Sequence, residues 1–253
     1  MVEKITGGAG WSLKIYTYNK KIMSMKNTFL GKLLHLADPT LPIGGFTHSN
    51  GLETYVQQGL VCDKVTADNY VRHNLWYNLK YNDAALMKLA YEATSSQDMD
   101  ALIALDQECT ALKSPREIRD ASKKLGVRIY KIFSRYQQQD FMLSWGELIQ
   151  KKEVDSHYCL MYGMLASLLE IPLEEALHGF YYNAAITMVT NAVKLVPLGQ
   201  LDGQDILFGL HDDILDLCKE TLIVERNLVG LCNIGFDIRC MQHERLYSRV
   251  YIS

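Results

Sequence analysis

The sequence has little of what marks a secreted, membrane-spanning or nucleic-acid-binding protein. Its 253 residues include only five prolines, and no uninterrupted apolar run reaches the ~18 residues that a membrane-spanning helix needs. The N-terminal residues lack the continuous apolar segment of a secretory signal. The 26 basic and 29 acidic side chains give a formal net charge of −3, which offers no basic field for nucleic acid or a membrane surface. These absences predict a cytoplasmic protein that binds neither.

Cysteine and histidine are present in numbers that require a test for disulfides and metal sites. None of the six cysteines forms a C-x-x-C pair, and several fall on apolar helix faces, which favours buried free thiols in a reducing compartment. Cys240 and His243, in "CMQH", have C-x-x-H spacing. A structural zinc site needs four ligands, and no second pair stands at a suitable spacing. The sequence therefore predicts no disulfide, no stable metal site and no cofactor.

The composition and the apolar spacing both favour an all-helical chain. Proline is scarce, good helix formers are abundant, and apolar residues recur at three- and four-residue spacing. Period-two strands bounded by turn residues are absent. We predict a single all-α domain over residues 26–253, a bundle of about nine or ten helices without significant β-sheet. Residues 1–25 are predicted to be a flexible leader, and residues 239–253 a C-terminal tail.

Helix starts and stops are marked by capping residues. In "SPRE", Ser114 is predicted to cap a helix, with Pro115 at its first position and Glu117 reaching back to the Ser114 amide. The segment His157–Glu170 is apolar nearly all round, which predicts a buried central helix with Gly163 allowing a close neighbour. Further helix starts are expected at Thr66, Asp83, Asp98, Asp140 and Asp202.

The stretch "LPIGGFTHSNGLE" (residues 41–53) allows three interpretations. His48 beside Ser49 could be a catalytic pair, but adjacent residues rarely reach hydrogen-bonding distance and no G-x-S-x-G elbow is present. The glycines lack the G-K-[ST] of a phosphate-binding loop. A tight turn into a helix, with Ser49 or Asn50 as N-cap and Gly59 after its end, is the simplest interpretation. A recognition loop remains open beside it.

Two further polar stretches are candidates for partner contacts. In "NAVKLVPLGQLDGQ" (residues 191–204), Lys194 suits the last turn of a helix, and with Gln200 and Gln204 it could also form a surface loop. The terminal stretch "RCMQHERLYSRVYIS" carries arginines and tyrosines at four-residue spacing, residue types that anchor protein interfaces. That segment could dock on its own core or be ordered by a partner.

Together, "LPIGGFTHSNGLE", "AVKLVPLGQLDGQ" and "MQHERLYSRVYIS" resemble the urease accessory protein UreF family. The resemblance covers nearly the whole chain, from about Leu33 to Ser253, in the right order and length. It implies an all-α homodimer without catalytic activity of its own. UreF-like proteins bind UreD, also called UreH, and then the GTPase UreG, and the assembly inserts nickel into apo-urease.

The resemblance also implies site residues. The first loop corresponds to a contact region near the GTPase-docking face, and Lys194 lies in the stretch that the family uses to couple GTP hydrolysis to metal insertion. Arg249 matches a tail arginine that becomes ordered when UreD binds. The predicted partner-binding residues are Pro42, Gly44, Gly45, Phe46, His48, Ser49, Lys194, Gln200, Gln204, Arg245, Tyr247 and Arg249.

Two other function classes compete with a scaffolding role. The protein could activate GTP hydrolysis by UreG, with Arg249 or Lys194 acting on the nucleotide as an arginine finger does. It could also be a hydrolase that uses His48 and Ser49. The scaffolding hypothesis is the one that the three stretches favour.

Overall fold

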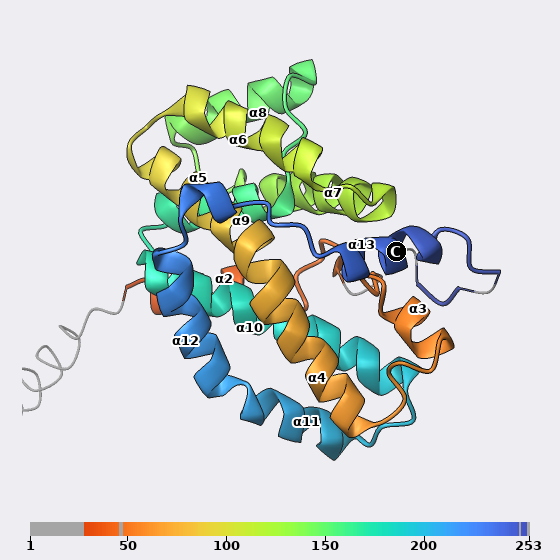
Figure 1. Ribbon diagram of the computed structural model, residues 1–253. Coiled ribbons are helices and arrows are strands. Elements are labelled where there is room, and N and C mark those ends of the chain that lie inside the picture. The colour runs from red at the N-terminus through yellow and green to blue at the C-terminus, as the bar shows by residue number, and fades with distance from the viewer. Residues whose placement is uncertain (1–27, 46–47, 248, 252–253) are drawn as a thin grey trace, which may run out of the picture.

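The computed structural model describes residues 28–45, 48–247 and 249–251, and this part of the chain is helical without a β-strand. It contains eleven helices when α4, η2 and α5 are counted as one continuous helix, slightly more than the nine or ten predicted (Figure 1). The segments, in order, are α2 (Leu30–Leu36), α3 (Leu52–Gln57), α4 (Lys64–Asn74), the π-helical η2 (Leu75–Ala84), α5 (Ala85–Ser95), α6 (Met99–Leu112), α7 (Arg116–Phe133), α8 (Asp140–Lys151), α9 (Tyr158–Leu168), α10 (Leu173–Leu195), α11 (Gln200–Gly209), α12 (His211–Leu222), the 3₁₀ turn η3 (Arg226–Leu228) and α13 (Ile234–His243).

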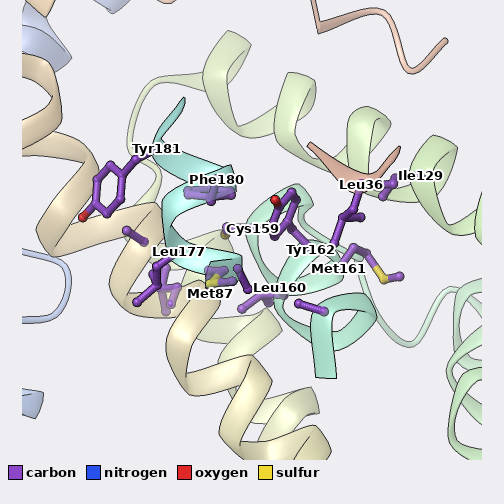
Figure 2. Packing of buried hydrophobic residues seen from close by; sticks show 14 of the residues in the cluster. Leu36, Met87, Ile129, Cys159, Leu160, Met161, Tyr162, Leu177, Phe180 and Tyr181 are labelled. Atoms are coloured by element: carbon purple, nitrogen blue, oxygen red, sulfur yellow. The ribbon is translucent and has the colours of Figure 1, made fainter. Parts of the chain in front are cut away.

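Helix α9 lies in the middle of the core, which confirms the predicted buried central helix. Leu165 and Tyr162 are fully buried, and Figure 2 shows Tyr162 on α9 beside Phe180 of α10. Gly163 lets α5 approach closely, because a Cβ at this position would overlap the carbonyl oxygen of Met87. The central position of α9 follows from a helix surface that has no polar side to expose.

The segment from Lys64 to Ser95 is one continuous helical rod. No helix starts at Asp83, and the start predicted at Thr66 lies three residues after the actual N-cap, so both predictions are wrong. Asp63 is the N-cap of α4, and Thr66 at the third helical position returns the hydrogen bond in a capping box. At Asp83 the backbone continues through η2 into α5. The Asp83 carboxylate instead accepts from the buried Lys113 ammonium, at 2.8 Å to each oxygen.

The "SPRE" prediction placed the start of α7 correctly to within two residues and assigned its side chains wrongly. Pro115 is the N-cap, and the helix begins at Arg116 without a side-chain cap. Glu117 does not reach back to the Ser114 amide, since its carboxylate accepts from His243 and Arg249 in the C-terminal region. Bonds to ionised or ring N–H donors of this kind are stronger than a bond to a neutral backbone amide.

Three other helix boundaries differ from the predicted ones by one to three residues. Gly51, in the left-handed region at φ 80°, is the N-cap of α3 in place of Ser49 or Asn50. Helix α8 begins at Asp140 itself after Gln139. Helix α11 begins at Gln200, and Asp202 accepts from the Gly199 amide. The predicted start of α6 at Asp98 and the turn glycine after α3, Gly59 at φ 70°, are confirmed.

The cysteines of the chain are free, as predicted, but not all are buried. Cys109, Cys159, Cys218 and Cys240 are buried, whereas Cys62 and Cys232 are exposed because they fall in the connections before α4 and before α13. In the part of the chain that the structure describes, no helix is long and apolar enough to cross a membrane. The predicted leader, residues 1–25, lies outside the described residues.

A substitution at Gly163 tests the packing of α9 against α5. We expect Gly163→Ala to lower the free energy of unfolding by roughly 1–3 kcal/mol, because its methyl group overlaps the Met87 carbonyl. Gly31→Ala is the matched control, since a Cβ on this helical glycine meets nothing within 4 Å, and alanine is the better helix former there by up to ~1 kcal/mol. Chemical denaturation of both variants measures the difference, and equal midpoints would contradict the packing.

Candidate functional site

Glu53, in the first turn of α3, is the centre of a site that connects α3 to the C-terminal residues His243, Val250 and Tyr251. The residue is only 4% exposed, although carboxylates are rarely buried unless they are paired. One carboxylate oxygen accepts from the Val250 amide at 2.7 Å. The other accepts from the Tyr251 amide at 3.3 Å and lies 3.1 Å from the His243 Nε2 atom. Glu53 therefore holds the tail, defined here as residues 244–251, by its backbone.

His243, the last residue of α13, lies between two carboxylates. Its ring is 1% exposed, with Nε2 at 3.1 Å from Glu53 and Nδ1 at 2.9 Å from Glu117. A neutral imidazole has one N–H donor, so both carboxylates can accept from the ring only when both nitrogens carry hydrogen. The imidazole ring therefore connects α13 to α3 through Glu53 and to α7 through Glu117.

Arg249 completes the attachment of the tail. Its Nη1 atom donates to the Glu117 Oε1 atom at 2.7 Å, while the other oxygen of Glu117 faces His243. The Arg249 side chain remains 36% exposed, so the pair itself contributes only ~0–1 kcal/mol to stability. Its role is to fix where the arginine lies, beside the N-terminal end of α7.

Helices α3 and α13 pack side by side next to α7, and Figure 1 shows them together with the C-terminus at one side of the molecule. The Thr54 hydroxyl donates to the Arg239 carbonyl at 3.0 Å, and the Arg239 guanidinium lies 4.7 Å from the centre of the Tyr55 ring. A Cβ on Gly51 would lie 2.8 Å from the Cys240 sulfur. The glycine thus serves both the left-handed backbone and the close approach of α13.

The glycine loop, residues 41–51, is held in place by α7 and α10. Arg128 of α7 donates to the Ile43 carbonyl at 2.7 Å, and a Cβ on Gly44, at φ 85°, would overlap its guanidinium. Asn191 of α10 donates to the His48 carbonyl at 2.8 Å. These contacts hold the described part of the loop, on either side of residues 46–47, against α7 and α10. The recognition interpretation stays a prediction.

The geometry gives no support to a catalytic pair at His48 and Ser49. The Ser49 hydroxyl is buried and has no hydrogen-bond partner among the described residues, so no base is positioned to activate it. Burial, aided by the charges of Lys124 and Arg128, lowers the pKa of His48 from its usual 6.5. Within the described ranges, no group of three or more potential ligand side chains is placed to hold a metal ion.

The structure brings only some of the predicted site residues together. Pro42, Gly44, Gly45, His48 and Ser49 lie in the glycine loop, and Phe46 lies outside the described residues. Arg245 and Tyr247 are exposed on the tail. Lys194, Gln200 and Gln204 are exposed at the corner between α10 and α11, beyond the Asn191 contact with the loop.

The acids that hold the tail were not predicted from the sequence. Glu53 lies inside the stretch singled out as "LPIGGFTHSNGLE", but nothing there indicates that its partner is almost two hundred residues away. Glu117 was assigned to capping. His243 was considered only as a metal ligand with Cys240. One signal was available in the sequence, namely a carboxylate, Glu53, two residues after the glycine at which α3 starts. Once such a carboxylate is buried, it must have hydrogen-bond partners.

The pH dependence of stability tests the burial of His48. Its pKa in the folded protein is lowered, so the unfolded chain binds a proton first as the pH falls through 6.5. We expect this residue to contribute a loss of stability below pH 6.5, with a slope of at most about 1.4 kcal/mol per pH unit. Urea denaturation between pH 7.5 and 5.5 should show a shallower loss for His48→Gln. His211→Gln, at an exposed position of α12, is the control, and the same change in slope for both would argue against the assignment.

Release of the tail tests the role of Glu53. Glu53→Gln replaces two acceptor oxygens by one carbonyl oxygen, so some of the donors on His243, Val250 and Tyr251 lose their partner. We expect this loss to destabilise the attached tail by roughly 1–3 kcal/mol. Cleavage by trypsin after Arg245 and Arg249 should become roughly 5- to 150-fold faster, with helix content unchanged by circular dichroism. Arg116→Gln, which breaks an exposed pair with Glu244, should have little effect. Equal cleavage of Glu53→Gln and the wild type would show that Glu53 does not hold the tail.

Comparison with known proteins identifies relatives that match most of the chain. A model of the UreF family matches residues 61–211, more than half of the chain and the part between the glycine loop and the tail. A relative from Actinobacillus pleuropneumoniae, named urease accessory protein UreF, is 47% identical over 224 residues, which cover 88% of this chain and 99% of the relative. A protein of the same name from Haemophilus influenzae (strain PittEE) is 45% identical over 226 residues, 89% of this chain and 96% of the relative.

A more distant relative extends the match to another bacterial lineage. The protein of the same name from Lachnoclostridium phytofermentans is 30% identical over 227 residues, which cover 90% of this chain and the whole relative. The alignments thus span nearly the full relatives rather than one shared motif. The chain belongs to the UreF family of urease accessory proteins.

Proposed function

We propose that the protein serves urease maturation as an adaptor without catalytic activity of its own. In this role it binds UreD (UreH) and the GTPase UreG in the cytoplasm, and the assembled complex delivers nickel, as cargo, to apo-urease. A homodimer is part of the proposal, as the family resemblance implies. Membership of the UreF family supports the maturation role, and the partners are inferred from the resemblance to that family.

The attachment of the tail to α3 and α7 is the observation that carries this proposal. Glu53 and Glu117 hold the tail through Val250 and Arg249, so the segment lies against α7 and against α3, the helix that follows the glycine loop. Two stretches from opposite ends of the sequence therefore present a single surface. A partner that recognises both stretches binds a shape that exists only in the folded chain.

The side chains on this surface are typical of a protein interface. Tyr247 is fully exposed, Val250 is 78% exposed, and Met241 and Ile238 on α13 are 42% and 47% exposed. Exposed apolar and aromatic side chains that cluster beside arginine are common where another protein docks. Arg245, exposed between them, adds a charge that can select an acidic partner surface.

Activation of UreG is the competing hypothesis. An arginine finger must reach the nucleotide of another protein, whereas Arg249 donates to Glu117 of its own chain at 2.7 Å. Lys194, exposed at the end of α10, is the other candidate for such a role. With Gln200 and Gln204 we assign it to a second contact with the complex. A measurement of GTP turnover by purified UreG, with and without this protein and without urease, separates activation from scaffolding.

Substitution of Arg249 tests the adaptor proposal. We expect Arg249→Ala to leave melting and helix content intact, since its own ion pair is half-exposed. Recruitment of UreG to the complex with UreD should weaken by about thirtyfold or more, because loss of an interfacial charged anchor costs ~2–5 kcal/mol. Arg249→Lys should recover only part, because lysine lacks the rigid two-pronged geometry of the guanidinium.

The measurement is a pull-down of UreG by the mutant complex, beside a urease activation assay. Arg116→Gln is the matched control, since it removes an exposed arginine at the start of α7 that pairs with Glu244 of the same tail. Wild-type recruitment and activation by Arg249→Ala would remove the tail from the mechanism. Loss of folding would assign Arg249 a structural role only.

A further inference from the structure

Two buried cysteines lie next to each other in a part of the molecule that the proposed interface does not use. Cys109, in the last turn of α6, and Cys159, in the first turns of α9, have their sulfur atoms 3.8 Å apart. Both side chains are fully buried, and Figure 2 shows Cys159 among the core side chains. A disulfide needs sulfurs about 2.0 Å apart, so an approach of about 1.8 Å would join them.

A lysine beside the pair makes this environment suited to a thiolate. The Lys113 ammonium is buried and bonded to both oxygens of Asp83 at 2.8 Å. The hydrogen bond from Cys159, with the charge of Lys113 in support, lowers the pKa of the Cys109 thiol. Burial raises the pKa of the Cys159 thiol. The lysine also repels a divalent cation, so the pair favours redox chemistry over metal binding.

A cavity is lined by residues that neighbour the pair along the chain. Its volume is about 200 Å³, enough for several molecules of the size of water. Tyr158, the residue before Cys159, and Lys113, one helical turn after Cys109, both line it. The two sulfurs lie behind this lining, so a small neutral oxidant in the cavity needs only a local opening of the packing to reach them.

We propose that Cys109 and Cys159 are a dithiol that hydrogen peroxide closes to a disulfide between α6 and α9. The Cys109 thiolate attacks one peroxide oxygen; an S–O bond forms, the O–O bond breaks, and the leaving hydroxide takes a proton to become water. The Cys159 sulfur, having given up its proton, then attacks the sulfenic sulfur of Cys109. The S–S bond forms, the S–O bond breaks, and a second water leaves. Two thiols lose two electrons, and one peroxide gains them.

The disulfide would connect the C-terminal end of α6 to the N-terminal end of α9. The end of α6 leads directly into α7, which holds the tail through Glu117. Cys109 lies one helical turn before Lys113, and α7 with Glu117 follows three residues later. Closure therefore ties the junction of α6 and α7 to the start of α9. This modification site is independent of the adaptor role and needs no partner protein for its test.

The test uses the full chain in a Cys62→Ser/Cys232→Ser background, which removes the two exposed thiols. After treatment with hydrogen peroxide, the protein is alkylated in denaturant and mapped by mass spectrometry without reduction. We expect a peptide pair joined through Cys109 and Cys159, lighter by two hydrogens and restored by dithiothreitol. Its formation should be at least about tenfold faster than oxidation of Cys218, a buried cysteine that serves as the internal control.

Trapping the intermediate tests the order of the two steps. In Cys159→Ser, dimedone should label Cys109 as a sulfenic acid, whereas in Cys109→Ser it should leave Cys159 unlabelled. Two free thiols at Cys109 and Cys159, at a peroxide dose that oxidises Cys62 and Cys232 of the wild type, would overturn the proposal. Preferential labelling of Cys159 would overturn the assignment of the attacking sulfur.

Discussion

The position of the C-terminal tail depends on the burial of one carboxylate. Glu53 is almost completely removed from water, and a buried charge is tolerated only when hydrogen bonds and an opposite charge replace its hydration. Its partners come from His243 and from the Val250 and Tyr251 amides. The requirement to satisfy this carboxylate therefore determines where Val250 and Tyr251 lie, and with them the position of Arg249.

The all-helical core provides the rigid frame on which this contact is built. Helix α9 is buried on every side, and its Gly163 allows α5 to pack without a gap. Helices α7 and α10 then hold the glycine loop through Arg128 and Asn191. Side chains on packed helices have few alternative positions, so Ile43 and His48 of the loop and Arg249 of the tail are each held against a fixed helix.

Local sequence was sufficient for the helical class, for the buried helix at His157–Glu170 and for the cap at Asp98. At Thr66 it misplaced a helix start by three residues, because Thr66 belongs to the capping box of Asp63. At Asp83 it predicted a new start inside a continuous rod, because polar residues are tolerated there when packing sustains the helix. The local sequence also failed at Glu117. An acid in the first turn of a helix has the same sequence signature whether it caps that helix or pairs with a distant residue, and Glu117 pairs with His243 and Arg249. The cluster of Glu53, Glu117 and His243 depends on tertiary contacts that no local pattern contains.

The long separation between Glu53 and its backbone partners has a consequence for how the protein is made. A ribosome produces the glycine loop and α3 almost two hundred residues before Val250 and Tyr251. Until those two residues emerge, the Glu53 carboxylate lacks the amide donors that make its burial favourable. The environment of α3 therefore changes late in synthesis, and a nascent chain that stops before Val250 keeps an acid whose burial is not yet compensated.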